Sequence, residues 1–257
     1  MTIAMRMDPR IAARRAAVEN EHQRRRTRRT LWLAAVVLAV AVAAVVLQSS
    51  LLAVDTVTVE GAVRSDPTVV AEVAGIEEGA SLLTLDLADA REAIVALPWV
   101  AEVASERSWS GEVVFTVTER TPVAAVAAGQ WWAVVDIAGR VLEVHEAPPA
   151  GLETVVGVTA PAAPGAWLAT RDLAAVAVAA RAAGDVVVGA ATRSVAVDEQ
   201  GAVVLDLEQG GRVLMGDDRQ LEEKLTAVRT FLLDVELTCM VTLDVRAPSA
   251  PVLRRGC

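Results

Sequence analysis

The chain has 257 residues, of which 54% are hydrophobic and only 3% aromatic, and it contains no tyrosine. Small and β-branched side chains must therefore fill its cores, which favours strands and thin helices over a large aromatic-lined pocket. The net charge of −9 is unevenly placed, because residues 1–30 carry nine arginines and only three acids. The acidic remainder excludes a general nucleic-acid binder, since phosphates would repel it.

A hydrophobic run without charges follows the arginine-rich segment. From Leu31 to Leu52 it is long enough, at about 1.5 Å per residue, to cross a hydrocarbon core of about 30 Å as a helix. The arginines before it predict a cytoplasmic tail at residues 1–30, a transmembrane helix at 31–53 and an extracytoplasmic C-terminus. The alternative is a cleaved signal peptide, which is less favoured because the run is long and no small-x-small cleavage site follows it.

Residues 54–121 predict a small α+β domain with the element order β-α-α-β-β. Alternating hydrophobic residues predict three strands, at residues 54–60, 100–107 and 112–119. Start and stop signals delimit two helices between the first two strands: Asp66, Pro67 and Gly75 for one, Asp86 and Pro98 for the other.

Residues 122–246 predict a β-rich domain with two helices, followed by a C-terminal tail at 247–257. The expected strands are 131–135, which a turn at 136–139 connects to Val141-Leu142, then 194–197, 202–207, 212–215 and 240–246, and the expected helices are 170–183 and 217–234. The three middle strands should form a meander, because short turns with glycine separate them.

Several short motifs occur in a fixed order along this α+β chain. They are Val57-x-Val59-x-Gly61, Leu97-Pro98-Trp99-Val100, Arg107-x-Trp109 and Glu119-Arg120-x-Pro122-Val123-Ala124. Together with the β-α-α-β-β order they resemble a polypeptide-transport-associated (POTRA) domain of the cell-division FtsQ (DivIB) family. Ser110 departs from that pattern, because family members often carry proline there.

The resemblance implies a non-enzymatic, bitopic scaffold of the bacterial divisome that needs no cofactor and sits in the cell membrane at the septum. It implies complexes with FtsB-like (DivIC-like) and FtsL-like membrane proteins. The family's partner-binding edge is its last strand, which corresponds here to Thr242, Leu243, Asp244, Val245, Arg246 and Ala247. Ala247 stands where some members carry an aromatic contact residue, so main-chain pairing is the expected binding mode. Since prolines cannot donate to a ladder, Pro248 and Pro251 predict that pairing ends near Arg246.

Two other classes of function remain as alternatives, a membrane-anchored cell-wall enzyme and a POTRA module of an export system. The chain has no recognisable nucleophile or zinc motif, and His145 is the one histidine outside the predicted tail. The only cysteines, Cys239 and Cys257, could form one bridge outside the cell or could be a buried thiol and an incidental terminal one.

Tryptophans offer a second set of candidate contact residues. Trp99 and Trp109 flank the second predicted strand, where they could either pack or anchor a partner. Trp131 and Trp132 are adjacent in a strand, so one should face inward and the other outward.

Overall fold

The computed structural model describes residues 28–42, 53–183, 190–234 and 237–257. Residues 28–42 are helical, but no helix within these ranges is both long enough and apolar enough to cross a membrane. The predicted transmembrane helix at 31–53 lies partly outside the described residues, as does most of the predicted tail at 1–30.

The described residues form two compact units. Of the described residues, the larger unit contains those within 58–75, 87–105 and 114–257, and the smaller contains those up to 57 together with 76–86 and 106–113.

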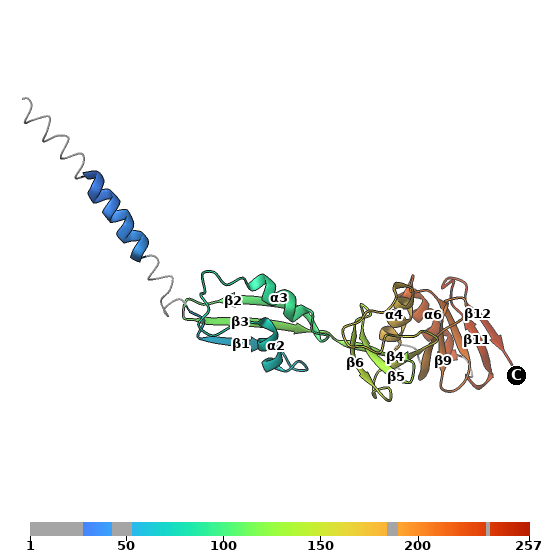
Figure 1. Cartoon of the computed structure of the whole chain (residues 1–257). Helices are drawn as coiled ribbons and strands as arrows, with labels where there is room; N and C mark the ends of the chain where they lie inside the picture. The colour runs from blue at the N-terminus through green and yellow to red at the C-terminus, as the bar shows by residue number, and fades with distance from the viewer. Residues whose placement is uncertain (1–27, 43–52, 184–189, 235–236) are drawn as a thin grey trace, which may run out of the picture. The chain divides into compact units, whose positions relative to one another are not determined.

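A three-stranded sheet is built from residues 56–119, as the alternating sequence predicts (Figure 1). Its strands β1 (Thr56–Glu60), β2 (Val100–Arg107) and β3 (Glu112–Glu119) lie in the order β1-β3-β2. Two helices, α2 (Pro67–Ala74) and α3 (Leu87–Val95), follow β1 along the chain.

The signals that predicted α2 act as expected. Asp66 caps it by accepting a hydrogen bond of 2.8 Å from the Thr68 N–H, and Pro67 occupies its first turn. Gly75 ends the helix in the left-handed conformation, with φ +64°.

A nine-stranded sheet occupies the rest of the chain, in the order β12-β11-β10-β9-β8-β7-β4-β5-β6. Its strands are β4 (Pro122–Ala128), β5 (Trp131–Asp136), β6 (Val141–His145), β7 (Glu153–Val156), β8 (Thr192–Val197), β9 (Val203–Leu207), β10 (Arg212–Gly216), β11 (Met240–Asp244) and β12 (Val252–Arg255). Strands β8, β9 and β10 form the predicted antiparallel meander, whereas β4–β7, β7–β8 and β10–β11 pair in parallel.

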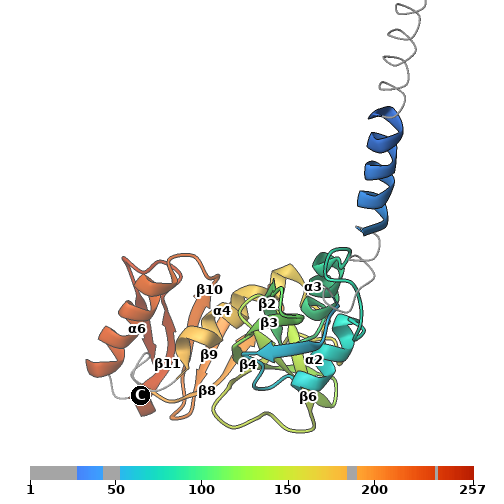
Figure 2. The same ribbon diagram turned by 90° about the vertical axis from the view of Figure 1, so that its left-hand side faces the viewer.

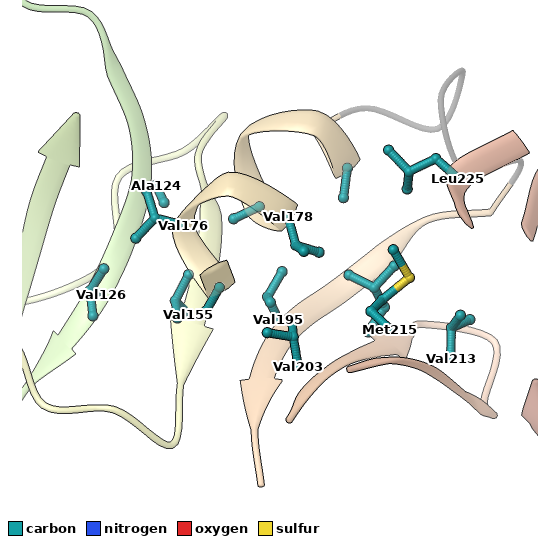
Figure 3. Close-up of a cluster of buried hydrophobic side chains, with 14 of the residues drawn as sticks. Ala124, Val126, Val155, Val176, Val178, Val195, Val203, Val213, Met215 and Leu225 are labelled. Carbon is teal, nitrogen blue, oxygen red and sulfur yellow. The ribbon is translucent and has the colours of Figure 1, made fainter. Parts of the chain in front are cut away.

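Helices α4 (Leu173–Ala182) and α6 (Leu221–Asp234) bury their apolar faces against this sheet (Figure 2). A short 3₁₀ turn, η2 (Thr170–Asp172), precedes α4, and another, η3 (Leu237–Cys239), precedes β11. The core consists mainly of valine, alanine and leucine, as the composition predicts (Figure 3). The predicted α+β class, with a β-rich C-terminal region carrying two helices, is confirmed.

Three strands were not among those expected from the sequence: β4, β7 and β12. The predicted boundary between the β-rich domain and a tail at residue 246 is wrong, because β12 adds a strand to the sheet beyond it. Helix α6 begins at Leu221 rather than at the expected Asp217.

Candidate partner-binding edge

Strand β11 contains the first three of the six predicted partner-binding residues, Thr242, Leu243 and Asp244. It lies between two neighbours, pairing in parallel with β10 and antiparallel with β12. Val245 is fully buried and donates its N–H to the Leu214 carbonyl at 3.1 Å. The expectation that residues 242–247 form the open edge is therefore wrong.

The chain reverses direction where the prolines were expected to end pairing. The Ala250 N–H donates to the Ala247 carbonyl at 3.0 Å, which closes a turn over residues 247–250. After Pro251 the chain returns as β12, whose Leu253 pairs with Leu243 of β11. Proline favours turns as well as interrupting ladders, so Pro248 and Pro251 border a hairpin here rather than ending the sheet.

Strand β12 is an edge of the nine-stranded sheet, because β11 is its single neighbour in the strand order. Its pattern of exposure is suited to an edge: Leu253 packs against the core, whereas Val252, Arg254 and Arg255 are exposed. Charged side chains on an edge strand discourage unspecific pairing with other chains. The edge thus combines accessible backbone with a positive charge in a chain whose net charge is negative.

A disulfide joins Cys239 to Cys257 and closes the β11–β12 hairpin, with a Cα–Cα distance of 5.4 Å. Of the two arrangements that the sequence allowed, the structure has the bridge. The Gly256 N–H also donates to the Cys239 carbonyl at 2.9 Å. A bridge between residues just before β11 and just after β12 requires the chain to return antiparallel, so the two cysteines were the one feature of the sequence that pointed to the last strand.

Arg246, which follows β11, pairs with Asp244. Its Nε donates to Asp244 Oδ1 at 3.0 Å, and Nη2 lies 2.5 Å from Oδ2. This hydrogen bond outweighs the effect of burial and holds the pKa of the Asp244 carboxyl below its usual value. Ala247 begins the turn, so it contributes no side chain that could act as an anchor.

A groove of about 640 Å³ adjoins the start of β12. One wall is α6, with Thr226, Thr230 and Phe231, and the other is formed by Pro248 and Pro251. Its lining is mostly apolar, although Glu222 and Glu223 lie on the helix wall. Since Pro251 directly precedes β12, a segment lying along the strand could extend into this groove.

Lys224, the one lysine of the chain, fixes the start of α6. Its ammonium group is buried and donates to the Met215 carbonyl at 2.9 Å, the Asp217 carbonyl at 3.0 Å and Asp217 Oδ1 at 2.7 Å. All three donors of the ammonium group are thus satisfied, which is the condition for burying such a charge. Lys224 therefore holds one wall of the groove.

The other edge of the nine-stranded sheet, β6, is partly covered by the chain itself. Val141 donates to the Ala166 carbonyl at 2.9 Å and accepts from the Gly165 N–H at 2.7 Å. Both backbone groups of Val141 are therefore used on the side away from β5. The start of β6 is closed to a further strand.

The Glu119-Arg120 motif stands at the end of β3. Both side chains contact other segments of the larger compact unit. Glu119 accepts three backbone hydrogen bonds, from Val63, Arg64 and Ser65. Burial acts to raise the pKa of the Glu119 carboxyl, but these N–H groups together lower it.

Arg120 forms the second half of this motif. Its Nη1 lies 2.7 Å from Oδ2 of the buried Asp136, and its Nε donates to the Val100 carbonyl at 2.9 Å. Asp136 also accepts from the Arg140 backbone N–H at 2.8 Å. Both guanidinium groups lie over the ring of Trp167, at 5.5 Å for Arg120 and 5.0 Å for Arg140. We call these four residues the arginine cluster.

The predicted tryptophans have different surroundings. Trp99 is partly buried beneath the Arg64 guanidinium, 5.1 Å away, whereas Trp109 is 70% exposed. Trp131 packs against the core, and both it and Trp132 are half-buried, so neither faces fully outward. His145 lies beside Glu143, and no group of three or more metal-binding side chains occurs in the described ranges.

Comparison with known proteins places the first sheet in a family. Residues 52–120 match the family described as "POTRA domain, FtsQ-type". Over 107 residues the chain is also 36% identical to "Cell division protein FtsQ" of Corynebacterium glutamicum. That alignment covers 42% of this chain and 48% of the relative, so the chain matches about half the length of that curated protein. The chain therefore carries an FtsQ-type POTRA domain, and its resemblance to the cell-division FtsQ (DivIB) family is confirmed.

Proposed function

We propose that this chain is a non-enzymatic membrane scaffold of the cell-division machinery that captures a partner segment on strand β12. The cell-division role is supported by the FtsQ-type POTRA domain and by the similarity to a protein named cell division protein FtsQ. The observation that carries the mode of binding is the edge position of β12.

Membrane anchoring by residues 31–53, with residues 1–30 in the cytoplasm, is part of this proposal. The charge-free run and the arginines before it support that topology. The Cys239–Cys257 bridge supports an extracytoplasmic location for the nine-stranded sheet, because disulfides persist in oxidising compartments. The full chain should stay in the membrane pellet after an alkaline carbonate wash, and recovery in the supernatant would contradict the anchor.

Strand addition explains how a site without a deep pocket can bind a partner. An edge strand offers unpaired backbone groups, and an added strand pairs with them by main-chain hydrogen bonds. The exposed Arg254 and Arg255 favour a partner strand that carries acidic residues. The groove beside Pro251 would accept an apolar side chain from the partner next to that strand.

The partners proposed for this edge are the extracytoplasmic segments of FtsB-like (DivIC-like) and FtsL-like proteins. Edge β12 is preferred to β6 because the start of β6 is already hydrogen-bonded to residues 165 and 166. Residues 242–244 pair with β12 inside the sheet, so β12 replaces residues 242–247 as the proposed contact segment.

Two neighbouring proline substitutions test strand addition. Adjacent residues of a strand direct their N–H groups to opposite sides, so Arg254→Pro and Arg255→Pro remove one N–H facing β11 and one facing outward. The proline variant that loses only the outward N–H keeps the β11–β12 hairpin. Its affinity for the partner should fall by about tenfold or more, equivalent to about 1.4 kcal/mol. Capture is measured by co-purifying the full chain with the co-expressed FtsB-like protein.

Arg254→Ala and Arg255→Ala are the matched controls, because they remove the charge but keep the N–H group. Urea unfolding identifies which proline variant keeps the stability of the wild type. If both proline variants capture the partner as well as their alanine controls do, strand addition at β12 is wrong.

A further inference from the structure

The end of the three-stranded sheet where the chain enters it is held together by backbone hydrogen bonds. Ala53 bridges to Ser81, the Val54 N–H donates to the Ala80 carbonyl at 2.8 Å, and the Gly79 N–H donates to the Val54 carbonyl at 2.8 Å. The turn that follows residue 79 therefore lies directly beside the first residues of the domain.

The tip of the β2–β3 hairpin lies at the same place. The Asp55 N–H donates to the Gly111 carbonyl at 2.7 Å, and the Thr56 N–H lies 3.3 Å from the same oxygen. Gly111 has φ +92°, and a Cβ there would come within 2.5 Å of Asp55 Oδ2. The positive φ favours glycine at this position, and the hydrogen bond from Asp55 fixes the hairpin tip to residue 55.

Residues 53–55, 79–85 and 108–111 belong to one compact unit, and we call them the entry rim. The rim carries two exposed apolar side chains, Trp109 at 70% and Leu83 at 41%. A tryptophan side chain brings a large apolar area together with one polar N–H, so it is costly to leave in water and is suited to an interface.

Trp109 is not needed to form its own turn. Ser108 accepts from the Gly111 N–H at 3.2 Å through its carbonyl, and its hydroxyl oxygen accepts from the Ser110 hydroxyl at 2.8 Å. The Ser108 N–H in turn donates to the Glu112 carbonyl at 2.8 Å. The turn is closed by backbone and serine groups, so the exposed indole is not needed to stabilise it.

We infer that Trp109, together with Leu83, inserts into the lipid headgroup region of the membrane that anchors the chain. This inference depends on the proposed anchor, which ends at Ala53, the residue that bridges to Ser81. A Cβ on Gly111 would lie 3.2 Å from the Ala53 carbonyl oxygen, and the two residues from Gly111 to Trp109 span at most about 7 Å, so the backbone of Trp109 lies within about 15 Å of that exit point. The headgroup region is about 5–8 Å deep on each side of a bilayer, and tryptophan is enriched there.

Charge does not favour this contact, because Glu77, Glu78 and Glu106 are exposed on nearby segments of the same unit. Insertion must therefore be driven by the indole and should occur in vesicles of uncharged phosphatidylcholine. Anionic lipid should weaken the contact rather than strengthen it.

A label at Ser110 tests the inference and leaves Trp109 in place. Because both native cysteines are joined in the disulfide, a single introduced thiol can be labelled with an environment-sensitive fluorophore under non-reducing conditions. The full chain carrying Ser110→Cys is reconstituted in phosphatidylcholine vesicles that contain nitroxide-labelled lipid. Strong quenching is expected, and most of it should be lost when Trp109→Ser is added.

Val63→Cys is the matched control, because Val63 is 86% exposed and follows β1 at its opposite end. Quenching at 110 no greater than at 63, or unchanged by Trp109→Ser, overturns the inference. A label at Leu38→Cys reports on the anchor separately. If that label is quenched while the label at 110 is not, the rim contact alone is wrong; if neither is quenched, the proposed anchor fails as well.

Discussion

The two ends of the nine-stranded sheet are stabilised in different ways. At the β6 end, the chain covers its own edge with residues 165–167, and the arginine cluster adds a buried carboxylate beside two guanidinium groups. At the β12 end, no strand lies beyond β12 among the described residues, and the hairpin is closed by a covalent bond.

This difference shows how a sheet can keep one edge open without losing the edge strand. Noncovalent closure at the start of β6 uses backbone groups that a partner would need, so that part of the edge is unsuitable for strand addition. A disulfide outside the ladder holds β12 while leaving its outward backbone groups to a partner. Stability and accessibility are thus provided by separate groups at the β12 end.

The largest effect is expected at the β6 end, from Asp136→Ala. Asp136 is 4% exposed, and its removal leaves the largely buried guanidinium of Arg120, whose side chain is 14% exposed, without a counter-charge. Loss of one partner of a buried ion pair costs about 3–5 kcal/mol. Urea unfolding of the full chain in detergent, followed by circular dichroism, measures the change.

Asp136→Asn is the control for shape, since it keeps an acceptor for the Arg140 N–H and removes only the charge. It should cost less than the alanine variant. If Asp136→Ala destabilises the chain no more than a change in an exposed ion pair does, the arginine cluster does not stabilise the β6 end.

The next largest effect is expected at the β12 end, from Cys239→Ser combined with Cys257→Ser. A bridge across 18 positions should contribute about 2–4 kcal/mol, chiefly by restricting the unfolded chain. Locally, amide hydrogen exchange should become faster in β12 and stay unchanged in β6.

Hydrogen exchange followed by mass spectrometry measures the exchange rate in peptides from β6 and from β12 separately. Equal acceleration in β6 and β12 would mean that the bridge stabilises the sheet as a whole, and the contrast between the ends would be lost. Reduction of the wild-type chain should reproduce the result of the double serine variant.

Local signals in the sequence predicted the POTRA domain well. The cap at Asp66, the stop at Pro98 and the alternation in residues 112–119 each act within a few residues, and each has the expected effect. Such signals are reliable because the forces that they report, capping and one-sided burial, are themselves local.

The strands that were missed lack these signals. In β4, Ala124, Ala125 and Val126 are all fully buried, so no alternation marks the strand, and alanine has little preference for strands. Strand β7 has only four residues and pairs in parallel with both neighbours, which are distant in sequence.

The candidate edge was misplaced by one strand for a related reason. Two prolines after Arg246 predict the end of the sheet, but a turn followed by a short strand has the same local sequence. Only the pairing of the last strand with β11, and the bridge that closes it, decides between these outcomes. That information lies in contacts between residues separated in the chain.

The smallest expected effect concerns the exposed ion pair at the β12 end and its dependence on pH. Because the folded-state pKa of Asp244 lies below its unfolded value, the pair contributes stability above about pH 4, and this is lost as the pH falls through the folded-state pKa. Asp244→Asn should therefore reduce stability slightly at about pH 6, and the loss should be smaller at about pH 2, because protonation of Asp244 then weakens the pair in the wild type as well.

Urea unfolding at both pH values measures this difference, which should be smaller than that of either preceding substitution. Arg246→Gln is the matched control, because it removes the same pair from the other side and should show the same dependence on pH. A loss in Asp244→Asn as large as that in Asp136→Ala would show that the β12 end also relies on a strong polar contact. The disulfide would then not be the main restraint on the open edge.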